Sequence, residues 1–395
     1  MAIRATKRGG LRTRLDADCD VLVCGASFAG LAVARELRGS GARVLMVDRY
    51  EVGERQTSAC AAPTDWLHSL DLNGAIRQTF QELVLHTPQH TARYRLPWEF
   101  CTFDYRELCA LLREQGADAE FETATVQGRH AGDGVAREPA RGRRGVEVIH
   151  TDRGLLRAPL VVDALGWRRV LGDGPPVAPP DARMSRGLEV HPAGRGEELE
   201  VWVDPRYVRA GYAWSFPARE EVRIGVGSFE PRDHVKESTV RLAGDLDLGP
   251  DGYQGNWIPH QLRPATGNGV FFVGDSAGHC LPLTAEGIRT ALYFGLACGR
   301  ELRAVIDGRS HRETALERYG AFSADHRWHF DWLLRIQHLV GRLGGSGVLS
   351  HTLRAMERQA VVDWAFRNYL NVAHPAFARD GRGQGFGRRG ALLAA

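Results

Sequence analysis

The hydrophobic pattern near the start of the chain predicts two parallel strands joined by a helix. Residues 20–24 and 43–47 form short, largely apolar runs, as expected of strands that are buried on both faces. Between them, residues 31–37 have helical spacing, and the Gly-Ser-Gly sequence at 39–41 ends that helix. Because an acidic residue, Asp48, follows the second run, the order is typical of a βαβ nucleotide-binding unit.

The rest of the chain continues this α/β pattern but interrupts it with a run of short strands. Further α/β elements are expected as a helix over 104–115, strands over 146–149, 160–163 and 270–273, and a helix over 286–306. Between 186 and 262, four strands with little helix between them predict an antiparallel sheet: 188–190, 198–203, 213–216 and 222–226. A helical pattern then extends to about residue 375.

We therefore expect an α/β fold in which a Rossmann-like domain carries an inserted antiparallel β-sheet substrate domain and C-terminal helices. The Gly- and Pro-rich stretch at 166–185 marks the start of the insertion. The expected boundaries are a basic tail over 1–17, the nucleotide-binding domain over 18–185 and 266–310, the substrate domain over 186–265, a helical region over 311–378 and a flexible tail over 379–395.

Composition and charge narrow the class of protein. With 43% hydrophobic and 25% charged residues among 395, the chain is typical of a globular protein. The formal net charge of +3 is unevenly distributed, because residues 1–14 carry +5 and residues 379–395 carry +3, which leaves −5 on the body between them. A nucleic-acid-binding protein usually concentrates positive charge on its folded body, so we expect no nucleic-acid partner.

Cysteine usage and hydropathy favour a reduced, cytoplasmic protein. The seven cysteines are an odd number without a Cys-x-x-Cys pair, and no apolar segment typical of a secretory signal precedes Cys19. No apolar run is long enough to cross a bilayer. We therefore expect at most peripheral membrane contact.

The turn over 25–30 is a degenerate dinucleotide fingerprint, in which Ser27 replaces the usual middle glycine. Its end glycines suit a tight turn and close helix packing, its amides suit a pyrophosphate, and Asp48 suits a ribose. The residues expected to contact the nucleotide are Gly25, Ala26, Ser27, Phe28, Ala29, Gly30 and Asp48. A perfect Gly-x-Gly-x-x-Gly at 385–390 has no preceding strand, so we interpret it as a false match.

Three later segments, taken with the βαβ unit, carry a resemblance to a known family, and that resemblance implies FAD as the nucleotide. The first two are Leu160–Trp167 and Gly211–Pro217, and a Gly-x-Gly at 225–227 follows the second. The third is Val273–Ile288, in which Gly-Asp, Pro and Glu-Gly-Ile have the spacing found in that family. Together they resemble the geranylgeranyl reductase family of FAD-dependent oxidoreductases, over about residues 18–310. That family shares its fold class with aromatic hydroxylases and flavin-dependent halogenases.

The resemblance implies further cofactor residues. Asp275 corresponds to the family's contact with the ribityl or phosphate part of FAD, and the helix that begins near residue 286 points its N-terminus at the flavin ring. Asp163 and Gly166 correspond to a turn near the adenosine. The remaining candidates are Arg49 near the adenosine, Arg106 near the phosphates, and Gly274, Pro282, Gly287 and Ile288 around the flavin. The alternative for Arg106 is an ordinary charge on a surface helix.

The resemblance also suggests where the chemistry takes place. Cys60 lies where the reductases often carry a cysteine facing the flavin, so it either donates a proton or simply packs. Tyr212 and Trp214 match a substrate-side motif, although alternating aromatic residues on a strand are equally typical of a core. His279 is either an acid or base near the flavin, or a histidine that contacts no substrate.

One helical segment, 325–332, carries two histidines and two tryptophans. His326 and His329 share a face, but no further ligands at suitable spacing accompany them, so we predict no metal site. Trp328 and Trp332 form an i, i+4 stripe that we interpret as core packing in preference to the lining of a substrate pocket.

Three functions remain open at this stage. The leading hypothesis is an FAD-dependent enzyme that reduces a C=C bond of an isoprenoid or other apolar substrate. The alternative is a flavin monooxygenase or halogenase that acts on a small or carrier-bound aromatic metabolite; a flavin-binding protein without turnover is a third possibility. Because only one dinucleotide turn has the right context, the reductant is expected to be transiently bound NAD(P)H or a reduced electron carrier, such as a donor protein.

Overall fold

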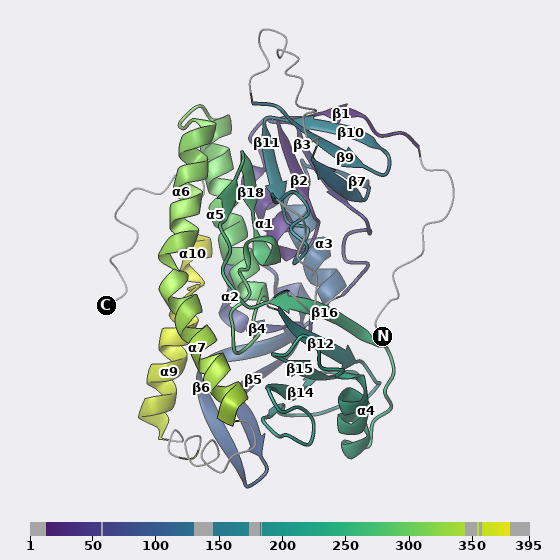
Figure 1. Ribbon diagram of the computed structural model, residues 1–395, viewed down its shortest axis with the longest axis vertical. Helices are drawn as coiled ribbons and strands as arrows, with labels where there is room; N and C mark the ends of the chain where they lie inside the picture. The colour runs from purple at the N-terminus through teal and green to yellow at the C-terminus, as the bar shows by residue number, and fades with distance from the viewer. Residues whose placement is uncertain are drawn as a thin grey trace.

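The computed structural model describes residues 13–56, 58–129, 145–173, 184–343 and 358–379, together with residues 182 and 354. Within these residues the chain forms three β-sheets, and helices pack against them (Figure 1). Both basic tails and the Gly-x-Gly-x-x-Gly at 385–390 lie largely or wholly outside the described residues.

The predicted nucleotide-binding unit is confirmed as a six-stranded sheet of order β17-β18-β11-β2-β3-β7. All neighbouring strands are parallel except β17 and β18. The strands are β2 (Val21–Cys24), β3 (Val44–Asp48), β7 (Glu120–Thr123), β11 (Leu160–Asp163), β17 (Thr266–Gly267) and β18 (Val270–Phe272). The helices of this part are α1 (Phe28–Leu37), α3 (Tyr105–Gln115) and α5 (Ile288–Ile306). The central strands are apolar throughout because both faces of the sheet are covered.

The predicted second sheet has eight strands in the order β16-β12-β15-β14-β13-β5-β6-β4. Five of them come from the expected insertion: β12 (Met184–Val190), β13 (Leu199–Trp202), β14 (Gly211–Ala218), β15 (Glu221–Ser228) and β16 (Gln254–Pro259). Helix α4 (Lys236–Asp245) contacts β12 and β15, and its apolar side chains share a core with theirs.

Three strands of this sheet come from a part of the chain that we had assigned to the nucleotide-binding domain. They are β4 (Ala61–Pro63), β5 (Ile76–Thr87) and β6 (His90–Phe103), and β5 pairs in parallel with β13. The expected boundaries therefore need correction, because the sheet is not built from residues 186–265 alone. The β5–β6 hairpin contains two register shifts and many half-exposed polar residues, which obscure the alternation that predicts a strand.

A third, four-stranded sheet has the order β1-β10-β9-β8. Its strands are β1 (Ala17–Asp18), β8 (Val126–Arg129), β9 (Glu147–Thr151) and β10 (Gly154–Ala158). Figure 1 shows the C-terminal helices along one side of the molecule, which confirms the predicted helical region. They are α6 (Arg312–Asp325), α7 (Arg327–Leu343), α9 (Gln359–Asn371) and α10 (Ala376–Arg379); α2 (Thr64–Ser69), η1 (Asn73–Ala75) and η2 (Gly274–Ala277) are short.

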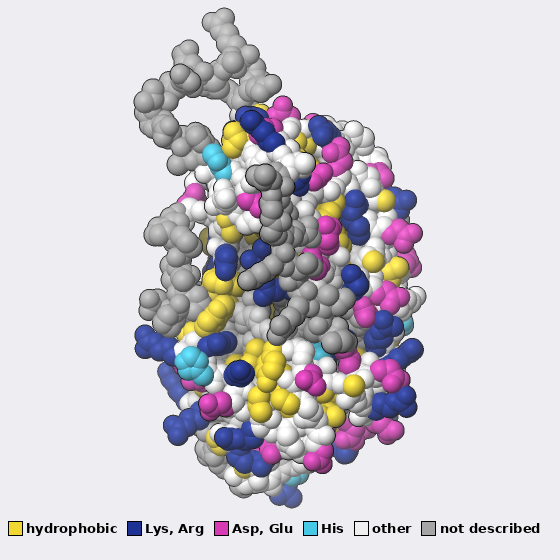
Figure 2. Space-filling view, turned by 90° about the vertical axis from the view of Figure 1, so that its right-hand side faces the viewer, with side chains coloured by type: hydrophobic (Ala, Val, Ile, Leu, Met, Phe, Trp, Pro, Cys, Tyr) yellow, Lys and Arg dark blue, Asp and Glu magenta, His cyan; other side chains and the backbone are white. Residues whose placement is uncertain are grey.

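Figure 2 shows acidic and basic side chains interspersed over one face, so the described residues of that face form no continuous basic surface. Among the helices of the described ranges, none combines the length and apolar character needed to span a bilayer.

Candidate functional site

The turn between β2 and α1 has the geometry of a phosphate-binding loop. Gly25 has φ +110°, and a Cβ atom on Gly30 would lie 1.9 Å from the carbonyl oxygen of Gly25. The helix can therefore start directly against the strand. The first turn of α1 has no acidic residue and no capping side chain, so its amides are available to an anion. This arrangement fits the diphosphate of FAD.

Asp48 lies at the end of β3 beside this turn. Its two carboxylate oxygens accept the amide hydrogens of Ala26 (2.8 Å) and Tyr50 (3.0 Å), and burial raises its pKa. Ser27 occupies the middle position of the fingerprint, and its Oγ lies 3.1 Å from the hydroxyl oxygen of Tyr105. The sequence did not single out Tyr105, because nothing in the local pattern pairs it with a residue 78 positions earlier.

Two arginines predicted near the nucleotide are exposed. The guanidinium of Arg49 lies 4.8 Å from the ring centroid of Tyr50. Arg106 opens α3, and its side chain makes no hydrogen bond or ion pair with any described residue. Its backbone packs against Gly53, where a Cβ atom would be 3.1 Å from the Cα of Arg106. Arg106 thus offers an uncompensated positive charge.

Asp163 is placed differently from the other predicted contacts. It is fully buried, and its carboxylate accepts hydrogen bonds from the amides of Leu165 (3.0 Å) and Leu171 (2.8 Å) and from the hydroxyl of Ser276 (2.7 Å). These bonds connect the loop around Gly166 to η2, which contains Gly274 and Asp275. Asp163 therefore shapes this part of the site from within.

Asp275 has the surroundings expected of a carboxylate that accepts hydrogen bonds from the hydroxyl groups of a ligand. No described residue donates a hydrogen bond to its side chain, and burial raises its pKa to about 6 against the opposing charge of Arg263. Gly287 lies against it, since a Cβ atom there would be 3.7 Å from Oδ1 of Asp275. The hydroxyl groups of a ribityl chain are donors of the required kind, so this position also fits FAD.

In the flavin-free protein, ionisation of Asp275 is expected to lower the free energy of unfolding as pH rises. Its folded-state pKa of about 6 exceeds the ordinary 3.8, so its contribution is fully present below the unfolded pKa and is lost as pH rises through the folded pKa. Because the residue is partly exposed, we expect a contribution of about 1–2 kcal/mol. Denaturant unfolding of wild type and Asp275→Asn measures it. A stability difference that does not change between pH 4 and pH 7 would contradict this prediction.

The loop between η2 and α5 brings the predicted flavin-side residues to the aromatic strand β14. The loop contains Pro282 and Gly287, and the hydroxyl of Tyr212 donates a hydrogen bond to the carbonyl oxygen of Thr284. The first turn of α5, which begins at Ile288, has no acidic residue and no capping side chain. Its N-terminal amides therefore retain the partial positive charge of a helix end.

Beside Tyr212, a row of four residues crosses the sheet, and the sequence analysis did not single out two of them, Glu189 and Gln254. Gln254, Glu189, Gly225 and Trp214 occupy directly opposite positions on β16, β12, β15 and β14. A Cβ atom on Gly225 would lie 2.1 Å from the indole of Trp214, so the ring lies across bare backbone. Its Nε1–H thereby reaches Oε2 of Glu189 at 3.3 Å. Gln254 also donates to Glu189, and Nε2 of His191 is 3.0 Å from the same carboxylate.

The Cys60 loop lies on the same face of the sheet. Cys60 is fully buried at φ +53°, its Sγ is 3.2 Å from the carbonyl oxygen of Ser58, and burial raises the pKa of the thiol well above its ordinary value. Arg223 on β15 donates to the carbonyl oxygens of Ala59 (2.9 Å) and Cys60 (3.3 Å). The amide of Gln254 is 3.4 Å from the carbonyl oxygen of Ser58, which connects the loop to the Glu189 row.

His279 points away from this face into the helical layer. It is fully buried, its ring stacks on Phe294 with centroids 3.7 Å apart, and its Nε2 is 3.0 Å from the hydroxyl oxygen of Ser323 on α6. Burial lowers its pKa well below the ordinary value, which keeps the ring neutral. This position favours packing over acid–base chemistry.

The helical segment with the His and Trp pairs differs in part from expectation. Trp328 and Trp332 are 68% and 50% exposed, so the interpretation of this stripe as core packing is wrong. His326 instead faces the core, where its Nε2 is 3.2 Å from the hydroxyl oxygen of Tyr293. No cluster of three or more His, Cys, Asp or Glu side chains suited to a metal ion occurs in the part of the chain that the structure describes.

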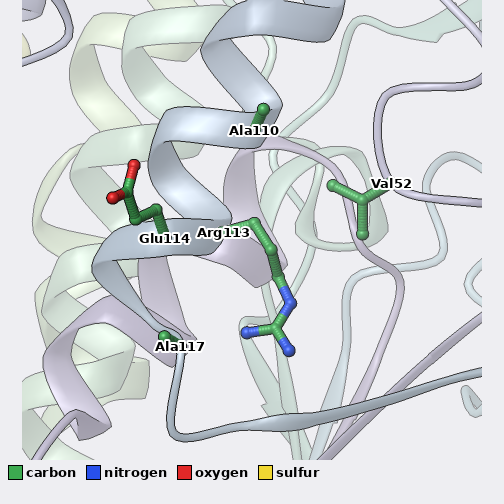
Figure 3. Close-up of a pocket in the computed structure, with 5 residues that line it drawn as sticks. All are labelled: Val52, Ala110, Arg113, Glu114 and Ala117. Carbon is green, nitrogen blue, oxygen red and sulfur yellow. The ribbon is translucent and has the colours of Figure 1, made fainter.

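A cavity of 420 Å³ lies beside the C-terminal half of α3. It is lined by Val52, Ala110, Arg113, Glu114 and Ala117. Figure 3 shows Arg113 extending on the side of Val52, whereas Glu114 points away from Val52. Arg113 donates to the carbonyl oxygens of Gly116 (2.8 Å) and Ala119 (2.6 Å), so backbone groups already hold its guanidinium. None of the predicted site residues lines this cavity.

Comparisons with known proteins agree with this fold. No family model matches the chain. Its sequence is 24% identical over 344 residues to digeranylgeranylglycerophospholipid reductase 3 of Methanosphaera stadtmanae. The matched region covers 78% of this chain and 83% of that protein. Its fold matches a geranylgeranyl bacteriochlorophyll reductase-like protein of Thermoplasma acidophilum with a TM-score of 0.77 at 16% identity, over 92% of this chain and 98% of the other.

The chain is an oxidoreductase similar in sequence to the digeranylgeranylglycerophospholipid reductases. The predicted fold class and the prediction that the chain is an enzyme are thereby confirmed. A further structure with this fold is PqsL of Pseudomonas aeruginosa, described as a probable FAD-dependent monooxygenase, with a TM-score of 0.62 at 18% identity over 88% of this chain and 99% of the other.

Proposed function

We propose that this oxidoreductase reduces a carbon–carbon double bond of an isoprenoid or another apolar substrate. The observation that carries the proposal is the convergence of the Cys60 loop, the aromatic strand β14 and the N-terminus of α5 on one side of the large sheet. The similarity to a digeranylgeranylglycerophospholipid reductase supports the same reaction type.

Reduced FAD supplies the hydride equivalent for such a reaction. The N-terminal amides of α5 would stabilise negative charge at the cofactor. Tyr212 and Trp214, whose ring centroids are 5.9 Å apart, would line the apolar side of the substrate and exclude water. Cys60 is the candidate proton donor, because its buried thiol stays protonated. His279 is assigned to packing.

The turn at 25–30, Asp48, Arg49 and Arg106 are proposed to hold the adenosine diphosphate, and Gly274, Asp275 and the 282–288 loop the ribityl and flavin parts. Asp163 and Gly166 are proposed to shape this second part. The electrons are proposed to come from transiently bound NAD(P)H or a reduced carrier protein, because among the described residues the turn at 25–30 is the single dinucleotide fingerprint in a strand–helix context.

Turnover without oxygen is the decisive expectation for a reductase. With dithionite as reductant, a geranylgeranyl-chain lipid should gain two hydrogen atoms per double bond reduced under strict anaerobic conditions, as measured by mass spectrometry. Cys60→Ala should slow this reaction about 10²-fold if the thiol acts as general acid.

The second candidate is a monooxygenase or halogenase acting on a small or carrier-bound aromatic metabolite, which the structural similarity to PqsL favours. It requires oxygen uptake and oxygen or halogen incorporation into an aromatic substrate. Product formation that stops without O₂ would overturn the reductase proposal and support this one.

A further inference from the structure

Helix α7 presents an apolar stripe to solvent. Trp328 and Trp332 are 68% and 50% exposed, and their parallel rings have centroids 6.3 Å apart. Leu339 on the same helix is 53% exposed. Because these positions are spaced i, i+4 and i+11, the three side chains share one face of the helix. Of the exposed large hydrophobic side chains among the described residues, half therefore lie on α7.

Arginines accompany this stripe. Arg335 and Arg342 occupy positions i+7 and i+14 from Trp328, which places them on the same face, and both are exposed. Neither forms an ion pair or hydrogen bond with any described residue. Asp331 is the one exposed acidic residue of α7. The face, defined here as Trp328, Trp332, Arg335, Leu339 and Arg342, is thus both apolar and cationic.

The opposite side of α7 is attached to the candidate active site. The side chain of Gln337 is buried; its Oε1 accepts the amide hydrogen of Leu283 (2.8 Å), and its Nε2 is 3.2 Å from Nδ1 of His260. Leu283 belongs to the loop between η2 and α5, and the neighbouring Thr284 is bound by Tyr212. A surface that meets the outer face of α7 is therefore close in structure to the flavin-side loop.

We propose that this face of α7 docks the protein on the surface of an anionic lipid bilayer. Tryptophan prefers the headgroup region, where its ring is apolar and its N–H stays hydrated, and arginine is attracted to anionic lipids. The purpose of docking rests on the proposed function, since an apolar isoprenoid substrate would reside in the bilayer. A second copy of the chain fits this face less well, because a two-fold contact would bring the unpaired arginines of both copies together.

Flotation of the purified full chain with lipid vesicles tests the proposal without an activity assay. The protein should bind vesicles that contain phosphatidylglycerol, bind less at high salt, and bind pure phosphatidylcholine weakly; its tryptophan emission should shift to shorter wavelength. Arg335→Gln and Arg342→Gln should each weaken binding about fivefold. The double variant Trp328→Ser/Trp332→Ser should abolish flotation while its thermal unfolding and FAD absorbance remain unchanged.

Tyr253→Ser is the matched control. Tyr253 is 43% exposed beside Lys236 on α4, which Figure 1 places well away from α7, so its variant should float like wild type. Flotation of the Trp328/Trp332 variant at the wild-type level would overturn the proposal and assign binding to another region, such as the basic tails. Failure of the wild-type protein to float would also overturn it. If the wild-type protein formed dimers and the Trp328/Trp332 variant did not, a second copy of the chain would be identified as the occupant of this face. None of these outcomes depends on whether the enzyme reduces a double bond.

Discussion

The Gly30→Ala variant is expected to purify folded but without FAD. Its new methyl group would lie 1.9 Å from the carbonyl oxygen of Gly25 and 3.3 Å from the side chain of Val23. The start of α1 must then move away from β2, which displaces the amides that we propose hold the diphosphate. We expect the ratio of flavin to protein absorbance to fall at least about tenfold, since a 1.4 kcal/mol loss of binding already gives that factor.

Gly244→Ala provides the matched control for this prediction. Gly244 is also a helical glycine, but a Cβ atom there meets no atom within 4 Å. Its replacement by alanine should leave FAD content unchanged and slightly raise stability through helix propensity. Circular dichroism distinguishes loss of cofactor from loss of fold. Full FAD content in Gly30→Ala would contradict the assignment of this turn to the diphosphate.

The Glu189→Leu variant is expected to keep FAD but lose about 10²-fold in kcat, because small displacements of positioned groups have effects of this size. Glu189 holds the indole of Trp214 directly and the Cys60 loop through Gln254. We therefore propose it as a positioning residue. Its removal leaves buried donors without an acceptor, so stability should also fall by about 1–3 kcal/mol.

Glu200→Leu makes the same chemical change elsewhere in the sheet. Glu200 lies on β13 opposite Ser215 and is bound to His86, so kcat should be unchanged. If Glu189 acts through Trp214, the effects of Glu189→Leu and Trp214→Phe on kcat should be strongly non-additive in the double variant. Additive effects, or a wild-type kcat in Glu189→Leu, would contradict the positioning role.

Short-range patterns are the basis for predicting the nucleotide-binding half of the candidate site, and the structure has the strands and helices that they predict there. The turn at 25–30, the acidic end of β3 and the 273–288 segment each lie within one stretch of chain. The glycines, the apolar runs and the acidic residue are required by local geometry: a tight turn, a strand buried on both faces and a helix start close to its strand. Such requirements can be recognised in the sequence without knowledge of which other segments pack against these residues.

Predictions were less accurate for residues whose surroundings are formed by segments that are distant in the sequence. The β5–β6 hairpin was assigned to the wrong domain, because its partner β13 lies more than one hundred residues later in the chain. Trp328 and Trp332 have the spacing of a buried stripe, yet the side of α7 that packs against the protein is set by Phe330, Leu333 and Gln337. Spacing defines the faces of a helix but not which one is covered.

The sequence by itself predicted the α/β fold class and the strand–turn–helix at 25–30 that we propose holds the diphosphate, since these depend on motifs with local geometry. The tertiary structure alone decided that Gln254, Glu189, Gly225 and Trp214 form one row, that His279 points into the helical layer, and that Tyr105 meets Ser27. The physical reason is strand register and packing. A shift of one residue in the pairing of β12 would move Glu189 to the opposite face of the sheet, and the same shift of β14 would move Trp214.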